Sequence, residues 1–144
     1  MVSTSALAID HGTKRTGFAV ADPLRITTQT LEQFEGDSTE ALHDYIDGLL
    51  AERTVGTFVV GLPLNMDGTE GPRTAEVRAF AAGLEQRFPG VAIAFQDERL
   101  STKAAAELQK EAGQFGAARK ANKDSMSALV ILRDWIEAGE PLGG

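Results

Sequence analysis

The 144-residue chain is long enough for one domain with a buried core, and 42% hydrophobic with 24% charged residues is ordinary for a soluble globular protein. The sequence has no run of about 18 apolar residues, which excludes a membrane-spanning helix, and its lack of cysteine excludes disulfides and thiolate metal sites. Together with the absence of a secretory signal, these features predict a single cytoplasmic domain over 1–144. A net charge of −7 weighs against a dedicated nucleic-acid binder, although basic clusters and bound divalent cations can offset it locally.

The first third of the chain predicts three strands followed by a helix. Each strand is a short apolar or β-branched run, and the short turns between them favour an antiparallel meander. Apolar residues at the spacing of one helix face then predict the helix, which Ser38 or Thr39 would cap. The strands are expected at 6–9, 17–21 and 26–28, and the helix at 38–52.

The rest of the chain alternates strands with helices around an irregular, turn-rich stretch at 62–72. The further strands are expected at 57–61 and 91–95, and the further helices at 73–88, 101–113 and about 122–139. Strands that alternate with helices pair in parallel through helical crossovers. The order βββαβαβαα therefore predicts an α/β protein with a five-stranded mixed β-sheet flanked by helices on both faces, which is the order of the RNase H-like fold.

Three acidic residues are placed where they could share a metal site at one edge of this sheet. Asp10 ends the first strand, Glu98 follows the fifth, and Asp124 lies in the first turn of the last helix, on the face that packs on the sheet. If the first and fifth strands are neighbours, Asp10 and Glu98 emerge together at their carboxyl ends. Carboxylate oxygens of this kind hold Mg²⁺ or Mn²⁺, and such ions activate water for phosphodiester hydrolysis.

Each acid also has a purely structural interpretation. Asp10 would satisfy backbone donors of the following glycine turn, Asp124 would cap its helix, and the adjacent Asp97 leaves open which of the two neighbours faces the site. His11 adjoins Asp10 and is a weaker candidate for a ligand contact, whereas His43 is typical of packing or of the surface. The sequence has no histidine metal cluster, no Ser-His-Asp pattern and no phosphate-binding loop of the P-loop type.

Four blocks of this sequence resemble the YqgF/RuvX family of RNase H-like nucleases. They are IDHGTKRTGFAVAD at 9–22, VVGLPLNMDG at 59–68, DERLST at 97–102 and KDSMSA at 123–128, and they follow the family's order over nearly the whole chain. The resemblance implies a RuvC-like fold with Asp10, Glu98 and Asp124 as the acidic site, so it favours Glu98 over Asp97. It also implies processing of the 5′ end of pre-16S ribosomal RNA, with Holliday-junction resolution as the alternative.

Two positions depart from the pattern of these relatives. His11 stands where many members have an apolar or aromatic residue, which changes the shape beside Asp10 but leaves the acids intact. RuvC-type resolvases also have a second acid close to the last one, whereas Ser125, Met126 and Ser127 follow Asp124 here. The missing acid makes junction resolution the less favoured activity.

We therefore expect a nuclease that uses one or two Mg²⁺ or Mn²⁺ ions bound by Asp10, Glu98 and Asp124. The side chains expected to contact the substrate are Lys14, Arg15, Asn65, Arg99, Arg119, Lys120 and Lys123. No pattern indicates base readout, so RNA selected by shape or single-strandedness is favoured over DNA. A second copy of the chain and proteins of ribosome maturation are further candidate partners.

Two other classes of function fit parts of the sequence. An Asp-x-Gly-Thr turn after a first strand also occurs in actin-like ATPases, but their duplicated domain needs more than 144 residues. A catalytically inactive RNA- or protein-binding module, with acids left as structural remnants, fits the net acidity. Stabilisation by Mn²⁺ separates this module from the nuclease, because a ligand that prefers the folded state stabilises it.

Overall fold

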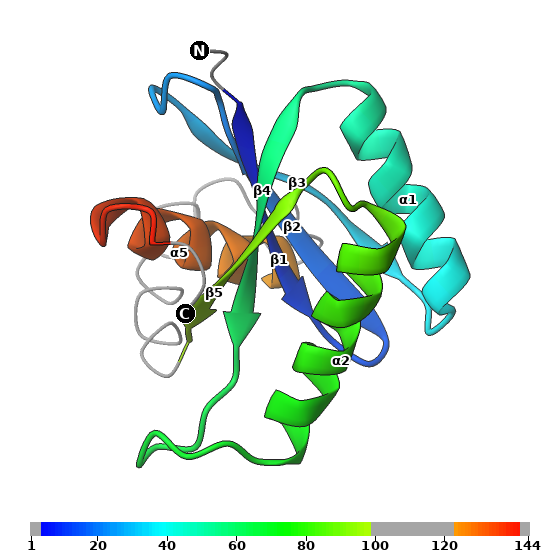
Figure 1. The fold of residues 1–144 in the computed structure, drawn as a ribbon, viewed down its shortest axis with the longest axis vertical. Helices are drawn as coiled ribbons and strands as arrows, with labels where there is room; N and C mark the ends of the chain where they lie inside the picture. Colours follow the sequence, from blue (N-terminus) through cyan, green and yellow to red (C-terminus); the bar gives the residue numbers. More distant parts are fainter. Residues whose placement is uncertain (1–3, 99–122, 142–144) are drawn as a thin grey trace.

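The computed structural model describes residues 4–98 and 123–141, which form a five-stranded mixed sheet with helices on both faces (Figure 1). The strands are β1 (Ser5–His11), β2 (Arg15–Ala21), β3 (Thr28–Glu35), β4 (Val55–Leu62) and β5 (Ala92–Asp97), and the helices are α1 (Thr39–Ala51), α2 (Pro72–Arg87) and α5 (Lys123–Glu137). The strand order is β3-β2-β1-β4-β5. β1 to β3 pair antiparallel, whereas β1, β4 and β5 pair in parallel, so the predicted architecture is confirmed.

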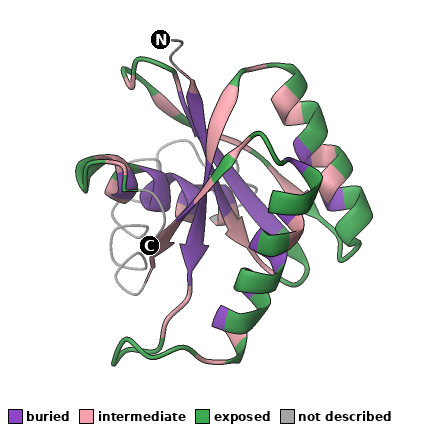
Figure 2. Cartoon of the chain, viewed as in Figure 1, coloured by how far each residue is buried: buried purple, intermediate pink, exposed green. Residues whose placement is uncertain are grey.

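Two hydrophobic cores lie on opposite faces of the sheet, and Figure 2 shows the buried strands between them. Large side chains fill the face under α1 and α2, among them Leu7, Ile9, Phe18, Phe58, Ile46 and Leu84. Small side chains line the face under α5, among them Ala6, Ala8, Ala19, Ala21 and Ala94. Alternation of large and small residues along each strand therefore lets α5 approach the sheet more closely than the other two helices.

Local sequence explains where the helices begin. The Ser38 hydroxyl accepts a hydrogen bond from the Ala41 N–H at 3.2 Å, which caps α1 as predicted. In the first turn of α2, Thr74 accepts from the Gly71 N–H and donates to the Pro63 carbonyl, so it ties the helix to the preceding loop. None of the helices in residues 4–98 and 123–141 combines the length and the apolar character that crossing a membrane requires.

The third strand differs from its prediction. It was expected at 26–28, but β3 begins at Thr28 and runs to Glu35. The Asp22 carboxylate accepts hydrogen bonds from the N–H groups of Leu24 and Thr27, which folds the β-branched stretch into a turn and leaves Ile26 75% exposed. The helix expected at 101–113 lies outside the described residues, and the remaining strand and helix boundaries agree within a few residues.

The sequence left open whether the first and fifth strands are neighbours. They are not, because β4 lies between β1 and β5. The route by which Glu98 reaches Asp10 is therefore different from direct adjacency.

Candidate active site

Asp10 lies near the end of β1 with a glycine beside it on each neighbouring strand. Its antiparallel partner in β2 is Gly17. The last paired residues of β1 and β4 are Ile9 and Val60, so Gly61 follows on the β4 side. A glycine inside a strand often marks a close approach by another part of the molecule, and both of these positions have that property.

Gly17 brings Asp124 to Asp10. A Cβ atom at Gly17 would lie 1.9 Å from the carbonyl oxygen of Asp124 and 2.5 Å from the backbone nitrogen of Ser125. Only glycine therefore lets the first turn of α5 rest on β2 at this point, directly across from Asp10. The negative charge of Asp124 accordingly raises the pKa of the Asp10 carboxyl group.

Gly61 brings Glu98 to Asp10 across the intervening strand. A Cβ atom at Gly61 would lie 2.4 Å from Cδ1 of Ile131 and 2.5 Å from Oε2 of Glu98, so the missing side chain leaves space that α5 and the carboxyl group share. The side chains of Glu98 and Asp10 are hydrogen-bonded to each other. The backbone N–H of Glu98 also donates to the Leu62 carbonyl at 3.2 Å, which continues the pairing of β4 and β5.

Strand alternation decides between the two adjacent acids. Asp97 pairs with Leu62, whose side chain belongs to the core under α1 and α2. Ala94 faces the α5 core, and Glu98 shares its parity along the chain. The structure thus places Glu98 on the face of Asp10 and Asp124, and Asp97 on the opposite face.

Burial and neighbouring negative charge disfavour the charged forms of Asp10 and Glu98. Burial raises the pKa of Asp10 to about 6, with a further contribution from the charge of Asp124. Burial and the Asp10 charge raise the pKa of Glu98 to about 7. The Arg73 guanidinium counteracts both shifts. A buried cluster of this kind favours a bound cation, because the cation would stabilise the charged form of each carboxyl group.

The carboxylate of Asp124 faces a positive charge. Its Oδ2 is buried and has no hydrogen-bond partner among the described residues, although Arg15 Nε lies 3.3 Å away in an ion pair. Within residues 4–98 and 123–141, no three acidic or histidine side chains stand arranged to hold a metal ion in their present positions. Asp10 and Glu98 are instead hydrogen-bonded to each other, and the neighbouring Asp124 pairs with Arg15.

Arg73 is a site residue that sequence analysis did not identify. It lies in the first turn of α2, and its guanidinium donates to the carbonyl oxygen of His11 and pairs with Glu76 at 2.6 Å. An arginine at a helix start carries no local signal for such a role, because the contact depends on how the helix packs against β1. Gly17 and Gly61, in contrast, are visible in the sequence as glycines inside strands.

His11 points away from the three acids. Its ring stacks on Phe80 of α2 with centroids 4.0 Å apart and an angle of 2° between the planes, and Nδ1 lies 3.4 Å from the Thr16 hydroxyl. Burial lowers the pKa of His11, with Arg73 acting in the same direction. His43 lies edge-on to Phe88 at 6.2 Å, which agrees with the packing role expected for it.

The predicted substrate-contacting residues are only partly described. Lys14 and Arg15 are exposed where the turn after β1 meets β2, and Arg15 pairs with Asp124. Asn65 donates from its side chain to the Thr69 hydroxyl at 2.9 Å, so its amide supports the loop between β4 and α2. Its contact with substrate stays a prediction. Arg99, Arg119 and Lys120 lie outside the described residues, and Lys123 is described only as the first residue of α5.

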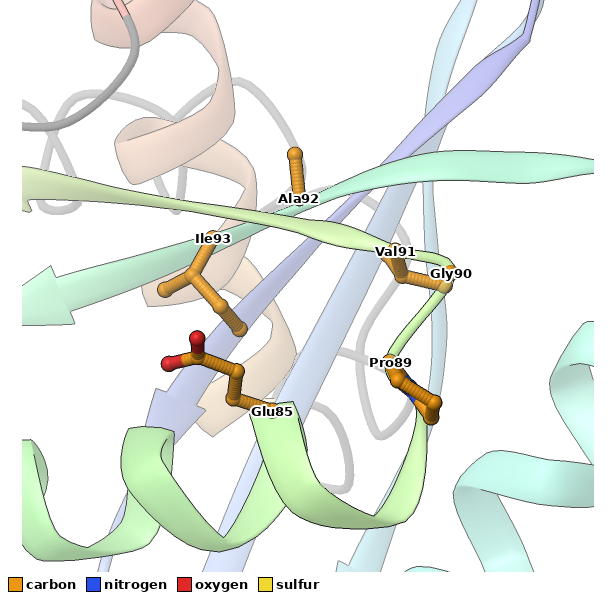
Figure 3. A pocket seen from close by; sticks show the side chains of 6 residues that line it. All are labelled: Glu85, Pro89, Gly90, Val91, Ala92 and Ile93. Atoms are coloured by element: carbon orange, nitrogen blue, oxygen red, sulfur yellow. The ribbon is translucent and has the colours of Figure 1, made fainter.

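A pocket elsewhere in the molecule does not belong to this site. It has a volume of about 470 Å³ and is lined by the end of α2, the following turn and the start of β5, including Glu85 and Ile93 (Figure 3). The acids lie at the opposite, carboxyl end of β5.

Sequence comparison places the chain in a family. The sequence profile of RuvX, described as "Holliday junction resolvase", matches residues 4–138. The chain belongs to the RuvX family. A relative from Pectobacterium carotovorum, named "Putative pre-16S rRNA nuclease", is 46% identical over 140 residues, which cover 96% of this chain and 99% of the relative. A relative of the same name from Maridesulfovibrio salexigens is 41% identical over 130 residues, covering 90% and 96% respectively.

Solved structures resemble this RuvX-family chain in fold. The Thermus thermophilus RuvC structure in complex with a Holliday junction substrate has a TM-score of 0.58 at 13% identity and covers 96% of this chain and 98% of its own. The fowlpox virus Holliday junction resolvase has a TM-score of 0.57 at 11% identity, covering 93% and 98%. These likenesses confirm the RuvC-like variant of the RNase H fold, and at such low identity they extend to the fold alone.

Proposed function

We propose that this RuvX-family chain is a divalent-metal-dependent nuclease that hydrolyses phosphodiester bonds, and that it acts in the cytoplasm on the 5′ end of pre-16S ribosomal RNA. The observation that carries the proposal is the buried Asp10–Glu98 pair with Asp124 beside it, at the carboxyl end of the parallel strands. Removing carboxylates from water is costly unless a positive charge compensates them. The names of the curated relatives support the choice of RNA.

Asp10, Glu98 and Asp124 are the residues that would hold Mg²⁺ or Mn²⁺. When bound, such an ion lowers the pKa of a water molecule and stabilises the charge on the leaving oxygen. Asp10 contacts Glu98 and lies across from Gly17, on which the backbone of Asp124 rests, so it would be the central one of the three carboxylates that hold the ion. Both carboxyl groups of the hydrogen-bonded pair must lose their protons to serve as ligands.

Cationic side chains near the acids would orient the nucleic acid. Arg15 pairs with Asp124 while its side chain remains 57% exposed. Its exposed guanidinium could therefore also bind a phosphate group, and the exposed Lys14 precedes it in the chain. The positive charge of Arg73 in α2 keeps the pKa values of Asp10 and Glu98 from rising further.

The proposal is tested by cleavage of labelled RNA that carries the 5′ leader of 16S rRNA, beside matched DNA and a four-way junction. Each substrate is incubated with Mg²⁺, Mn²⁺ or EDTA. Asp10→Asn and Glu98→Gln should abolish metal-dependent cleavage while the variants stay folded. Asp97→Asn is the matched control, because it changes the adjacent acid on the opposite face of the sheet and should retain activity.

Three results would contradict the proposal. Full activity of Asp10→Asn would exclude this acidic site, and equal loss in Asp97→Asn and Glu98→Gln would contradict the assignment of the second ligand. Failure of the wild type to cleave any substrate would favour the binding module. Preference for the four-way junction would support resolution as the activity, in line with the description of the family profile.

A further inference from the structure

The first turn of α5 is tied to two strands by the hydroxyl group of Ser125. This side chain is completely buried. It accepts a hydrogen bond from the N–H of Phe18 in β2 at 3.1 Å and donates one to the carbonyl oxygen of Leu31 in β3 at 2.6 Å. Phe18 and Leu31 are cross-strand partners, so the helix contributes a hydroxyl to the junction of the two strands.

The same junction contains a β-bulge. Thr16 pairs with Phe34 and Phe18 pairs with Leu31, so Gly17 faces two residues of β3. One of these two is Gln33, whose side-chain oxygen accepts a hydrogen bond from the backbone N–H of Asp124 at 3.3 Å. Gln33 thereby satisfies one of the N–H groups that a helix leaves unpaired at its start.

Asp124 is thus held by its backbone on both sides. Its own N–H is bound by Gln33, and the next residue is bound to both strands through the Ser125 hydroxyl. Its carbonyl oxygen rests on Gly17, which is the cross-strand partner of Asp10. These contacts fix the position of the Asp124 backbone relative to Asp10, whereas Oδ2 of its carboxylate is paired with the largely exposed side chain of Arg15.

We propose that Ser125 and Gln33 are positioning residues that set the place of Asp124 against Asp10, and thereby the affinity of the site for a divalent cation. This inference rests on the proposed function, because it assumes that the acids bind a metal ion. Neither residue contacts the cation in this scheme. They act through the backbone of Asp124, as groups behind the ligands of a metal site generally do.

A purely structural role makes a different prediction from a positioning role. Loss of a buried hydroxyl that pairs with two backbone groups lowers stability in either case. Only the positioning role also lowers metal affinity, because α5 would then shift on β2 and carry the Asp124 carboxylate away from Asp10. The affinity for metal, compared at matched stability, therefore separates the two.

The test measures Mn²⁺ binding by electron paramagnetic resonance, which detects the free ion and needs no catalytic turnover. Ser125→Ala and Gln33→Ala should each raise the Kd for Mn²⁺ by about 10- to 100-fold, the range found when residues that orient metal ligands are removed. Ile46→Val is the control, because it removes a methylene group from the core under α1, on the opposite face of the sheet. It should lower the urea midpoint and leave the Kd unchanged.

The outcomes are distinguishable from failure of the proposed function. Wild-type protein that binds no Mn²⁺ would overturn the metal site itself, and this inference with it. Wild-type binding with an unchanged Kd in Gln33→Ala and Ser125→Ala would overturn the inference alone. If Ser125→Ala does not fold, Gln33→Ala decides the question, because Gln33 lies on the edge strand β3 and is only partly buried.

Discussion

Replacing Asp10 by asparagine should stabilise the metal-free protein at neutral and alkaline pH while it abolishes cleavage. The reason is that burial and the neighbouring acid Asp124 raise the pKa of Asp10 from its ordinary value of 3.8 to about 6. In the unfolded chain the carboxyl group loses its proton more easily than in the folded one. Asparagine has nearly the same shape and no charge, so it removes this penalty.

The size of the effect follows from the two pKa values. The folded state holds a proton that the unfolded state releases, so stability falls as the pH rises from about 4 to above 6. A tenfold change in acidity is worth about 1.4 kcal/mol, which sets an upper limit of about 3 kcal/mol for Asp10 above this range. The Asp10 and Glu98 carboxyl groups titrate as an interacting pair, so part of the cost of ionising the site belongs to Glu98 and remains in the variant. We therefore expect Asp10→Asn to increase the free energy of unfolding by about 1–3 kcal/mol at pH 8 and not at pH 4.

The assay is urea unfolding of the wild type and Asp10→Asn at pH 4 and pH 8, in the presence of a chelator. A gain of this size should also raise the melting temperature at pH 8 by about 3–8 °C. Added Mn²⁺ should then stabilise the wild type but not the variant, which reverses the ranking. Equal or lower stability of Asp10→Asn at pH 8 would refute the argument that buried like charges dominate this site.

Three further predictions concern the surroundings of the acids. Gly61→Ala should reduce cleavage at least about tenfold and destabilise the fold by about 1–3 kcal/mol, because the added Cβ atom would occupy the space of Oε2 of Glu98; unchanged kinetics would contradict this. Arg73→Met should move the acidic limb of the pH–rate profile to higher pH, since Arg73 lowers the pKa of both buried carboxyl groups, whereas Arg78→Met, which loses an ion pair with Glu70 and a cation–π contact with Phe95, should leave the limb in place. Ser38→Ala should lower stability by about 1 kcal/mol in urea unfolding with no change in cleavage, and a loss of activity would link α1 to the site.

The placement of the three acids could be predicted because each has a local signal. Asp10 and Glu98 follow apolar strands, and Asp124 shares its helix face with Ala128 and Trp135, which are buried against the sheet. Such signals depend on residues close in the chain. They identify the edge of the sheet at which a side chain emerges, but they do not identify its neighbours there.

The strand order could not be read from local patterns, and it has a physical consequence. Direct adjacency of β1 and β5 would need no special residue between their acids. With β4 between them, the glycine at position 61 leaves space for the Glu98 carboxyl group, and this gives Gly61 a role that its apolar surroundings in the sequence do not reveal.

The third strand was misplaced because the β-branched residues that suggested it, Ile26 and Thr27, belong to the turn that precedes β3. The Asp22 carboxylate holds this turn by hydrogen bonds, and β3 itself is an edge strand with several exposed polar residues, which gives a weak strand signal. The contact of Gln33 with α5 arises from a bulge in this strand. The contact of Gln33 with Asp124 joins residues 91 positions apart, and no periodicity within either segment predicts it.

The acids therefore converge mainly because side chains are missing around Asp10. Glycine at position 17 admits the backbone of α5, and glycine at position 61 admits the carboxyl group of Glu98. An added methyl group next to Asp10 should therefore displace the neighbouring acids directly, because a closely packed interior has no free space to accept it. The buried contacts that hold Asp124 in place have the same importance, because no free space lets α5 settle elsewhere on β2 without moving its carboxylate.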